Sequence, residues 1–571
     1  MRIARAALAC AAVLAVGVVL VSGGSDADPH TPPALPGRPA PFLGTAVSGD
    51  GGLTAAVDAY GDVVDLRAPG PAGAALIDNP SARQSAGTVP TDTGIVPRVR
   101  IDGGGAVAMW RADWVTQHYL PGTNVVRTIA RFGGTQMVMT TATEGESLAV
   151  MVRTLVDHGR KGSGEDSIPT LGVDVASELR CARERRAGQL DLLCRVRRAV
   201  PPVPAAAAGD GGIVAQACAH LVRSAAHDAR RWLNRSRPLG ADAPSAASES
   251  GSPGGTVPGW AESMYERSLL AIHALSSRAT GAVAAGARDG WAYVWPRDAA
   301  IAALALAASG HRAEARQIAR FLTDLDLSAA ARFGESGAPV PGRAAQGDAA
   351  GWVDAAARVT GVPAPAKPFA WRDRADYQES SPGTYLGNAL AAAETAAERA
   401  RIAREFGTSR GLVRSAGDPG SGLDSAAAWA VRPFGLQALY PAAEKTLLRL
   451  VGQGTRYGIT PGEGWTGGED PWTAPTAWSA WALAGLATDR KTGVRDPRTN
   501  LPAVRAGGGP SRRSLRLRHA ALALVADLRR ASTPAGDLPE RVGVQTGIPT
   551  STTPLLWSSA FTVLALRELW P

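Results

Sequence analysis

The sequence predicts two large domains, an antiparallel β-sandwich followed by an all-α domain built from repeated helix pairs. A chain of 571 residues is too long for one ordinary domain. Between residues 41 and 200, short apolar runs alternate with glycine-containing turns, and Arg98-Val99-Arg100-Ile101 shows the period-two pattern of a half-buried strand. From residue 260 onward, apolar residues recur at helical spacing instead.

The first 27 residues have the pattern of a secretory signal. Two arginines precede the 16-residue apolar run 6–21, and a small-x-Ala sequence follows at 25–27. The run is slightly short for a spanning helix, and an uncleaved N-terminal membrane anchor is the alternative. We therefore expect a secreted or extracytoplasmic protein. Residues 28–40 are Pro-rich and predict an extended linker.

The predicted sandwich, residues 41–200, carries two of the cysteines. Cys181 and Cys194 flank a segment that reads as two strands around a turn, so we expect a disulfide across a hairpin. Residues 201–259 are expected to form a linker, with a helix at 213–235 and a low-complexity loop. Cys218 falls on that helix and is predicted to be a buried thiol.

Residues 260–571 are expected to be helical without strands. The first helix begins near Trp260, and Gly310 suits the position just after a helix end in a helical hairpin. A closed α/α toroid and an open solenoid would both give this pattern. The further predicted helical segments are 297–309, 311–325, 349–359, 383–406, 433–450, 473–488, 514–530 and 554–569.

Charge and composition exclude some classes of function. The net charge of +9 is spread along the chain without a basic block or aromatic-interleaved basic segment, which argues against a nucleic-acid partner. No Cys/His spacing suggests a structural metal.

The stretch Arg288–Ala300, RDGWAYVWPRDAA, is the strongest local candidate for chemistry. It combines Trp291, Tyr293 and Trp295 with the pair Arg297–Asp298 at the start of a predicted helix. Aromatic rings cover the C–H faces of sugars, and a fixed Arg/Asp pair can bracket sugar hydroxyls. A buried Trp cluster with a structural ion pair is the competing interpretation.

Two glutamates in loops before helices are candidates for acid–base work. Glu379 lies in RADYQESSPGTYLGNAL and Glu540 in GDLPERVGVQTGIPTSTTPLLWSSAF. Glycoside hydrolysis needs one protonated carboxyl and one ionised carboxylate, and only a closed fold would bring these two together. Taken singly, either residue is more simply a carboxylate stabilised by a helix dipole.

Several of these segments resemble family 15 of the glycoside hydrolases, the bacterial glucoamylase-like proteins that include glucoamylase, glucodextranase and trehalase relatives. WPRDAA resembles their substrate-binding motif, DYQE the element that carries the general acid, and LPE followed by PLLWS the element that carries the general base. YLPGTNVVRTIARFGG resembles their N-terminal sandwich. Two positions depart from the pattern: Gln378 stands where a Trp is usual, and Ser559 where a His is common.

The resemblance implies an (α/α)6 toroid over residues 260–571. It also implies a general acid at Glu379 and a general base at Glu540. Further substrate-binding residues follow by matched position: Trp352, Arg456, Trp472 and Trp557. Asp424, before another helix, is read as structural.

The function implied is hydrolysis of terminal α-linked glucose from an oligo- or polysaccharide, with inversion, without a cofactor or metal, by a monomer. A non-catalytic envelope protein that binds glycans is the main alternative, motivated by Gln378 and Ser559. Another α/α-toroid enzyme, such as a phosphorylase or a lyase, is the third interpretation, against which Glu540 argues.

Overall fold

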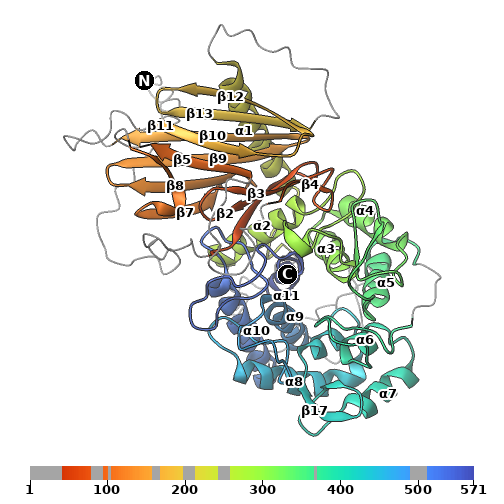
Figure 1. Ribbon diagram of the computed structural model, residues 1–571. Helices are drawn as coiled ribbons and strands as arrows, with labels where there is room; N and C mark the ends of the chain where they lie inside the picture. Colours follow the sequence, from red (N-terminus) through yellow and green to blue (C-terminus); the bar gives the residue numbers. More distant parts are fainter. Residues whose placement is uncertain are drawn as a thin grey trace, which may run out of the picture.

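The computed structural model describes residues 42–78, 94–100, 104–156, 168–196, 212–241, 257–364, 370–488 and 511–571. The predicted signal or anchor, the Pro-rich linker and most of the low-complexity loop lie outside these residues. Strands gather in the N-terminal part of the chain and helices in the C-terminal part (Figure 1).

Two antiparallel sheets pack face to face in the N-terminal part, which confirms the predicted sandwich. Hydrophobic side chains from both sheets, such as Val57 and Met139, share one core between them. The larger sheet has the order β1-β2-β3-β5-β11, with β4 beside β3 and β6 beside β5, and the other has the order β12-β13-β10-β9-β8-β7. The strands are β1 (Thr45–Gly49), β2 (Thr54–Asp58), β3 (Val63–Ala68), β4 (Ala74–Asp78), β5 (Gly94–Arg100), β6 (Ala106–Ala108), β7 (Trp114–Tyr119), β8 (Val126–Phe132), β9 (Thr135–Glu144), β10 (Ser147–Val156), β11 (Ile168–Asp174), β12 (Leu179–Arg186) and β13 (Gln189–Val196).

The expected disulfide and buried thiol are both present. Cys181 and Cys194 are direct partners in the register of β12 and β13, and their sulfurs are bonded. Cys218 lies on α1 (Ile213–Leu233), which packs on the outer face of the six-stranded sheet through a small cluster that includes Leu221 and Ala142. The Cys218 thiol donates to the Leu192 carbonyl at 3.4 Å.

The C-terminal helices form a closed ring, which distinguishes a toroid from a solenoid. Six inner elements contact one another in a circle, in the order α3, α5, α6, η5, α9, α11 and back to α3. These are α3 (Pro296–Ala308), α5 (Ala349–Thr360), α6 (Leu386–Ala391), the 3-10 helix η5 (Ser425–Ala430), α9 (Thr473–Thr488) and α11 (Leu556–Leu569). Their side chains are almost all buried; every residue of α9 from Thr473 to Leu486 is buried, for example.

Five outer helices surround this inner ring and follow one another around it in Figure 1. They are α2 (Gly259–Ala274), α4 (Arg312–Thr323), α7 (Ala396–Phe406), α8 (Tyr440–Gln453) and α10 (Arg512–Ala531). Among the residues described between α5 and α6, no helix fills the sixth outer position. The ring is therefore an (α/α)6 toroid with one outer position open.

Three details of the helical prediction were wrong. The expected helix 383–406 is two helices, α6 and α7, and a capping box formed by Thr395 and Glu398 starts the second. The helix expected from residue 433 begins at Tyr440. Two short hairpins also occur, β14 (Arg332–Phe333) with β15 (Pro339–Val340), and β16 (Val413–Ser415) with β17 (Asp418–Leu423). In contrast, Gly310 has φ +95° directly after α3, as expected of a residue that ends a helix.

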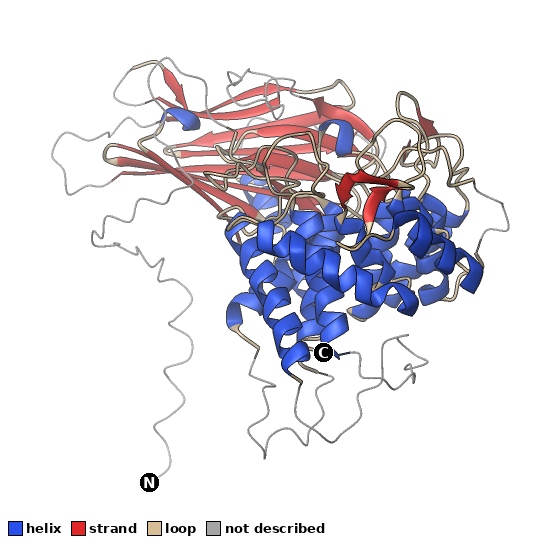
Figure 2. Cartoon of the chain, turned by 90° about the horizontal axis from the view of Figure 1, so that it is seen from below, coloured by secondary structure: helices blue, strands red, loops and turns tan. Residues whose placement is uncertain are grey.

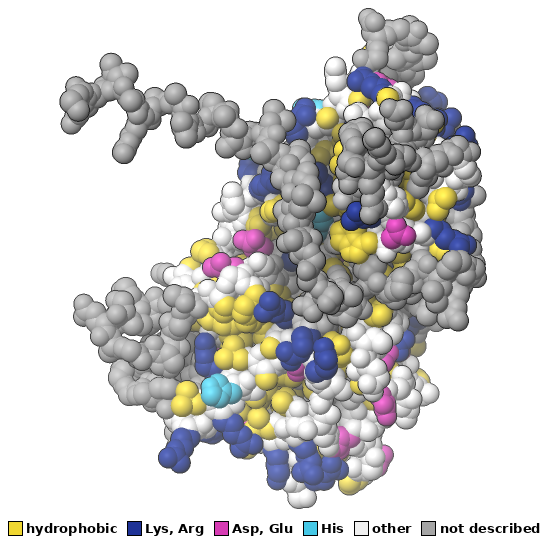
Figure 3. All heavy atoms as spheres, turned by 90° about the vertical axis from the view of Figure 1, so that its left-hand side faces the viewer, with side chains coloured by type: hydrophobic (Ala, Val, Ile, Leu, Met, Phe, Trp, Pro, Cys, Tyr) yellow, Lys and Arg dark blue, Asp and Glu magenta, His cyan; other side chains and the backbone are white. Residues whose placement is uncertain are grey.

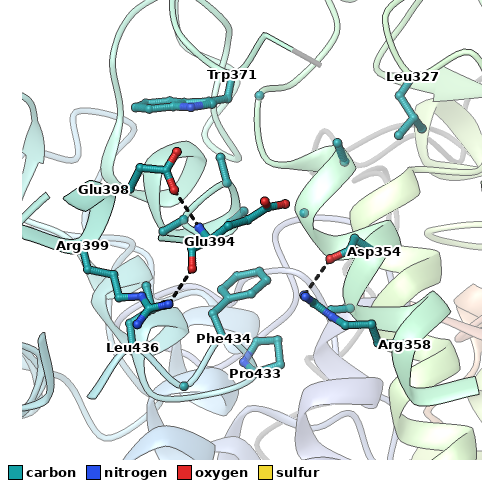
Figure 4. Close-up of a pocket in the computed structure, with 18 of the residues that line it drawn as sticks. Leu327, Asp354, Arg358, Trp371, Glu394, Glu398, Arg399, Pro433, Phe434 and Leu436 are labelled. Carbon is teal, nitrogen blue, oxygen red and sulfur yellow. Dashed lines mark hydrogen bonds and ion pairs between the residues drawn. The ribbon is translucent and has the colours of Figure 1, made fainter. Parts of the chain in front are cut away.

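A hollow of about 1260 Å³ marks the open outer position (Figure 4). Its walls come from α5, from the end of α6 and start of α7, and from the segment 433–438. Trp371 and Phe434 border it, and the ion pair Asp354–Arg358 (2.7 Å) lies on the α5 side. None of the predicted site residues lines this hollow.

Loops and turns crowd the end of the helices that lies toward the strands, as Figure 2 shows. On the face in Figure 3, Lys and Arg side chains are scattered over the surface among acidic and apolar ones, rather than gathered in one block. Within the described parts of the chain, none of the helices has the length and apolar character needed to cross a bilayer.

Candidate active site

Several predicted site residues, with Asp348 and Asp424, lie at the N-terminal ends of the inner elements. Trp295 is the residue before α3, and Asp348 is the residue before α5. Asp424 precedes η5, Trp472 precedes α9, and Trp557 is in the first turn of α11. Because the inner elements are arranged in a ring, their starts converge even though the residues are far apart in the sequence.

Arg297 and Asp298 form the fixed pair that the sequence predicts, and both side chains are buried. The Arg297 guanidinium lies 3.4 Å from Asp298 and 3.0 Å from Asp348, and it donates to Gln346 Oε1 at 2.8 Å. Its Cζ stands 4.5 Å from the centre of the Trp557 ring. Arg297 is thus held from three sides, and Trp557 packs against it as a buried support.

Asp298 differs from an ordinary surface carboxylate in its protonation. Burial, together with the nearby charges of Asp348 and Glu540, raises the pKa of Asp298 to about 7 against the opposing effect of Arg297. Near neutral pH the Asp298 carboxyl therefore exists in both forms and can either donate or accept a hydrogen bond.

Glu540 is held at a fixed position by its backbone. Its N–H donates to the Thr552 carbonyl and its carbonyl accepts from the Thr473 N–H, both at 2.9 Å. The carboxylate accepts hydrogen bonds from the Ser551 hydroxyl and from the Trp291 indole. Burial raises the pKa of Glu540, whereas these two hydrogen bonds and the neighbouring charges of Arg541 and Arg343 lower it.

Glu379 lies on a strained turn before α6. Its φ of +58° is in the left-handed region of backbone conformation. Residues other than glycine adopt this region only at a cost in free energy, and those that do are often found at functional sites. Its N–H donates to the Asp376 carbonyl at 2.9 Å. The Glu379 side chain is 39 % exposed and forms an ion pair with Arg343.

A buried polar network packs against the turn that carries Glu379. Arg414 pairs with Asp376 at 2.8 Å, and the Tyr377 hydroxyl donates to Asp424 Oδ1 at 2.8 Å. The side chain of Gln378 joins the same network, since its Nε2 donates to the Tyr377 hydroxyl at 2.9 Å and to Asp424 Oδ2 at 3.3 Å. Gln378 thus points into the protein beneath Glu379, and Asp424 has the structural role expected for it.

Arg343 is a site residue that sequence reasoning missed. Its guanidinium pairs with Glu379, interacts electrostatically with Glu540 and lies 5.5 Å from the centre of the Trp295 ring. One cation therefore pairs with one of the predicted catalytic carboxylates, interacts electrostatically with the other and covers one of the predicted aromatic faces. Arg343 lies in the segment after β15, in the sequence GRAA, which matches no motif. Only the folded hairpin places it beside Glu379 and Trp295.

The structure places two of the predicted sugar contacts away from the other candidate residues. Trp352 is completely buried and packs edge-on against Trp429 at 5.2 Å in the hydrophobic core, so it has no surface to offer a sugar. Arg456 is exposed, and its guanidinium covers the ring of Tyr457 at 4.8 Å. It lines a separate hollow with Arg530 and Gln545, and none of its described contacts reaches the carboxylates.

The remaining predicted aromatic residues contact Glu540, its neighbour Arg541 or Arg332. Trp291 is half-buried and donates a hydrogen bond to Glu540. The Arg332 guanidinium lies over the ring of Tyr293, 4.9 Å from the ring centre. Trp472 pairs across a bridge with Arg541, the residue after Glu540, and packs edge-on against Trp465 at 5.1 Å. The described residues contain no group of three or more His, Cys, Asp or Glu arranged to hold a metal ion.

Comparison with known proteins agrees with this architecture. Residues 259–330 match the family model described as glycosyl hydrolases family 15. A crystal structure of a bacterial glucoamylase complexed with acarbose is similar over 94 % of this chain and 95 % of that one, with a TM-score of 0.63 at 12 % sequence identity. Saccharomycopsis fibuligera glucoamylase is 14 % identical over 56 % of this chain and 97 % of its own, with a TM-score of 0.42. A search of curated proteins finds no match.

The sandwich and the closed α/α ring together have the fold of the bacterial glucoamylase structure. More narrowly, residues 259–330 are the segment that is similar to the model of glycosyl hydrolases family 15.

Proposed function

We propose that the protein hydrolyses terminal α-linked glucose from oligo- or polysaccharides, with inversion of configuration. The observation that carries this proposal is that Arg343 forms an ion pair with Glu379 and also interacts electrostatically with Glu540, although the two glutamates come from distant parts of the sequence. The family match supports the same reaction class.

In this mechanism the two carboxyls act on opposite sides of the bond that breaks. Glu379 in its protonated form gives its proton to the glycosidic oxygen as the bond from that oxygen to C1 of the terminal glucose breaks. Glu540 in its ionised form takes a proton from the water whose oxygen bonds to C1. Inversion needs carboxyls about 6.5–9.5 Å apart, so that the water fits between base and sugar.

The terminal glucose would be held by the pair Arg297–Asp298 and by the aromatic faces of Trp291, Tyr293 and Trp295. Two buried polar atoms of this cluster have no hydrogen-bond partner among the described residues: Trp295 Nε1 and Asp348 Oδ1. Unpaired buried polar groups are costly, and sugar hydroxyls are suitable partners for them. A tight arrangement of this kind favours action at chain ends.

We further propose that the protein works outside the cytoplasm. The disulfide Cys181–Cys194 supports an oxidising compartment. The signal-like pattern of residues 1–27 points in the same direction.

Glucose release from maltose, isomaltose, trehalose and soluble starch tests the function, with the anomer followed by NMR spectroscopy. Release of β-glucose is expected from at least one of them, and that substrate names the linkage. Release of α-glucose would contradict inversion. Absence of release from all four would contradict the hydrolase itself.

A non-catalytic glycan-binding protein is the second candidate, and the ion pair Glu379–Arg343 favours it. A guanidinium beside a carboxylate favours the ionised form, whereas a general acid must start protonated. Sugar binding measured by calorimetry without turnover would support this candidate. Replacing Gln378 by the Trp usual in the family would then test whether acid function can be restored.

A further inference from the structure

Two arginines, Arg332 and Arg343, lie together beside the candidate general acid. Arg332 is in β14, and Arg343 follows β15, so one hairpin positions both. The N–H of Ala331 donates to the Arg343 carbonyl at 3.3 Å, which fixes the two segments against each other. The hairpin is tied to the aromatic loop by mutual hydrogen bonds of 2.8 Å between Val294 and Phe333.

Both guanidiniums cover aromatic rings that the sequence assigns to sugar binding. Arg343 stands over Trp295 and Arg332 over Tyr293, at 5.5 and 4.9 Å from the ring centres. A saccharide unit next to a terminal glucose held beside these rings would therefore be in reach of the two cations. Because Arg343 also pairs with Glu379, that unit is the one next to the bond being broken.

The positive charge of the two arginines is only partly compensated. Arg343 pairs with Glu379, but the hydrogen-bond acceptors recorded for Arg332 are carbonyls, those of Gly290 and Pro341. Arg332 Nε is buried and has no hydrogen-bond partner among the described residues. Burial and the adjacent Arg332 lower the pKa of Arg343, which reflects the cost of holding two cations here.

The positive charge of the two arginines is compensated less when the general acid Glu379 is protonated. A protonated Glu379 carries no charge, so Arg343 then loses its ion pair and keeps only its electrostatic interaction with Glu540, while it remains partly buried. An anionic group in the leaving part of the substrate would replace that partner. Arginine suits this purpose, since its planar guanidinium binds carboxylates and phosphates through paired hydrogen bonds.

We propose that Arg332 and Arg343 form an anion subsite that selects α-glucosides whose leaving group carries a carboxylate or a phosphate. This inference rests on the proposed hydrolysis for its kinetic test, but its binding test does not need turnover. It adds a specificity to the candidate site, since Arg297–Asp298 would hold the neutral terminal glucose and the two arginines would read the unit beyond it.

The kinetic test uses two pairs of substrates that differ in charge on the leaving group. Maltobionate is compared with maltitol for a carboxylate, and trehalose 6-phosphate, with its phosphorylated unit as leaving group, with trehalose for a phosphate. We expect kcat/KM to be on the order of tenfold higher for at least one anionic member, the usual strength of a charge-assisted hydrogen bond. That preference should fall in Arg343→Gln and in Arg332→Gln. The pair that shows it identifies the anion.

Arg358→Gln is the matched control, because Arg358 is in the last turn of α5, whereas the site is at the first turn of that helix. It removes the same charge and should leave the preference intact. Equal kcat/KM within both pairs in the unaltered protein would overturn the proposal, as would a preference that survives both site substitutions.

The binding test separates this inference from the hydrolase proposal. Calorimetry on Glu379→Gln should show tighter maltobionate binding relative to maltitol than the unaltered protein does, since Arg343 has lost its carboxylate partner. This holds even if no variant hydrolyses anything. An unchanged ratio, or no binding of either ligand, would contradict the anion subsite.

Discussion

The carboxylate of Glu540 is buried yet surrounded by groups that favour its charge. Ser551 and Trp291 donate hydrogen bonds to it, and Arg541 and Arg343 lie within electrostatic reach. A base that takes a proton from water must be ionised, and these neighbours offset the effect of burial.

Glu540→Gln should therefore lower kcat by about two to four orders of magnitude, the usual contribution of a general base. The amide can still accept from Ser551, so the melting temperature should change little. Glucose release and thermal unfolding of the same preparation check both parts. Activity within a few-fold of the unaltered protein would remove Glu540 from the mechanism.

Substitution of Glu379 should have an effect that depends on the substrate, because proton donation matters only when the leaving group is poor. Glu379→Gln should lose much of its rate on a disaccharide but much less on an aryl or fluoride α-glucoside. Comparing kcat/KM for the two kinds of substrate measures this. Equal losses on both would contradict the role of general acid.

The inner elements of the ring explain why the candidate residues meet. Each begins at the same end of the toroid, so a short loop before any of them delivers its side chains to one place. Asp424 shows how such a start is stabilised, since its Oδ1 accepts from the Ala426 N–H at 2.7 Å at the beginning of η5.

Asp424 should also make stability depend on pH. Burial raises the pKa of Asp424 to about 7, from an ordinary value of 3.8 in the unfolded chain. The folded state therefore holds a proton that the unfolded state releases, and stability falls as pH rises from about 4 to about 7. Asp424→Asn should flatten this fall in urea unfolding series. The exposed Asp418→Asn is the control, and an identical slope in Asp424→Asn would contradict the prediction.

The contact between α5 and α6 depends on a glycine. A Cβ on Gly351 would stand 2.0 Å from the carbonyl oxygen of Ala391, where backbone must move to accommodate it. Gly351→Ala should destabilise the fold by ~1–3 kcal/mol, as overpacking in a core does. Chemical denaturation measures this, with Gly452→Ala as control because a Cβ there meets nothing within 4 Å. Equal stability of the two variants would contradict the close contact.

Sequence patterns predicted these elements better than they predicted the site. Long runs of small and apolar residues mark α3, α9 and α11, which are buried on nearly every side. Periodicity cannot show that Trp352 turns into the core, since buried and sugar-facing tryptophans share the same local sequence. Arg343 was missed for a related reason, because its partners come from other parts of the chain and only the tertiary fold assembles them.

The two domains are joined by a buried polar hub rather than by apolar contact alone. Arg267 of α2 donates to the Thr123 carbonyl at 3.0 Å and to Asn124 Oδ1 at 2.6 Å. It also pairs with Asp537 at 3.3 Å, and Asp537 accepts from the Tyr119 hydroxyl at 2.6 Å. Sandwich residues and toroid residues thus satisfy one another's buried charges.

Arg267→Met should leave Asp537 as a buried charge without its cation, at a cost of about 3–5 kcal/mol. Because the hub joins the domains, we expect calorimetry to show one unfolding transition in the unaltered protein and two in the variant. Arg529→Met is the control, since Arg529 lies over Trp260 without an ion pair among those recorded. A single unshifted transition in Arg267→Met would contradict the coupling.

The open outer position beside α5 has a consequence for how this chain can change. Where an outer helix packs on its neighbours, it restricts the length of the loops that join it to them. The hollow bordered by Trp371 and Phe434 places no such restriction on loop length. Added sequence between α5 and α6 would meet free volume before it met the inner ring. The toroid can thus lengthen at this point while the order of its inner elements stays as it is.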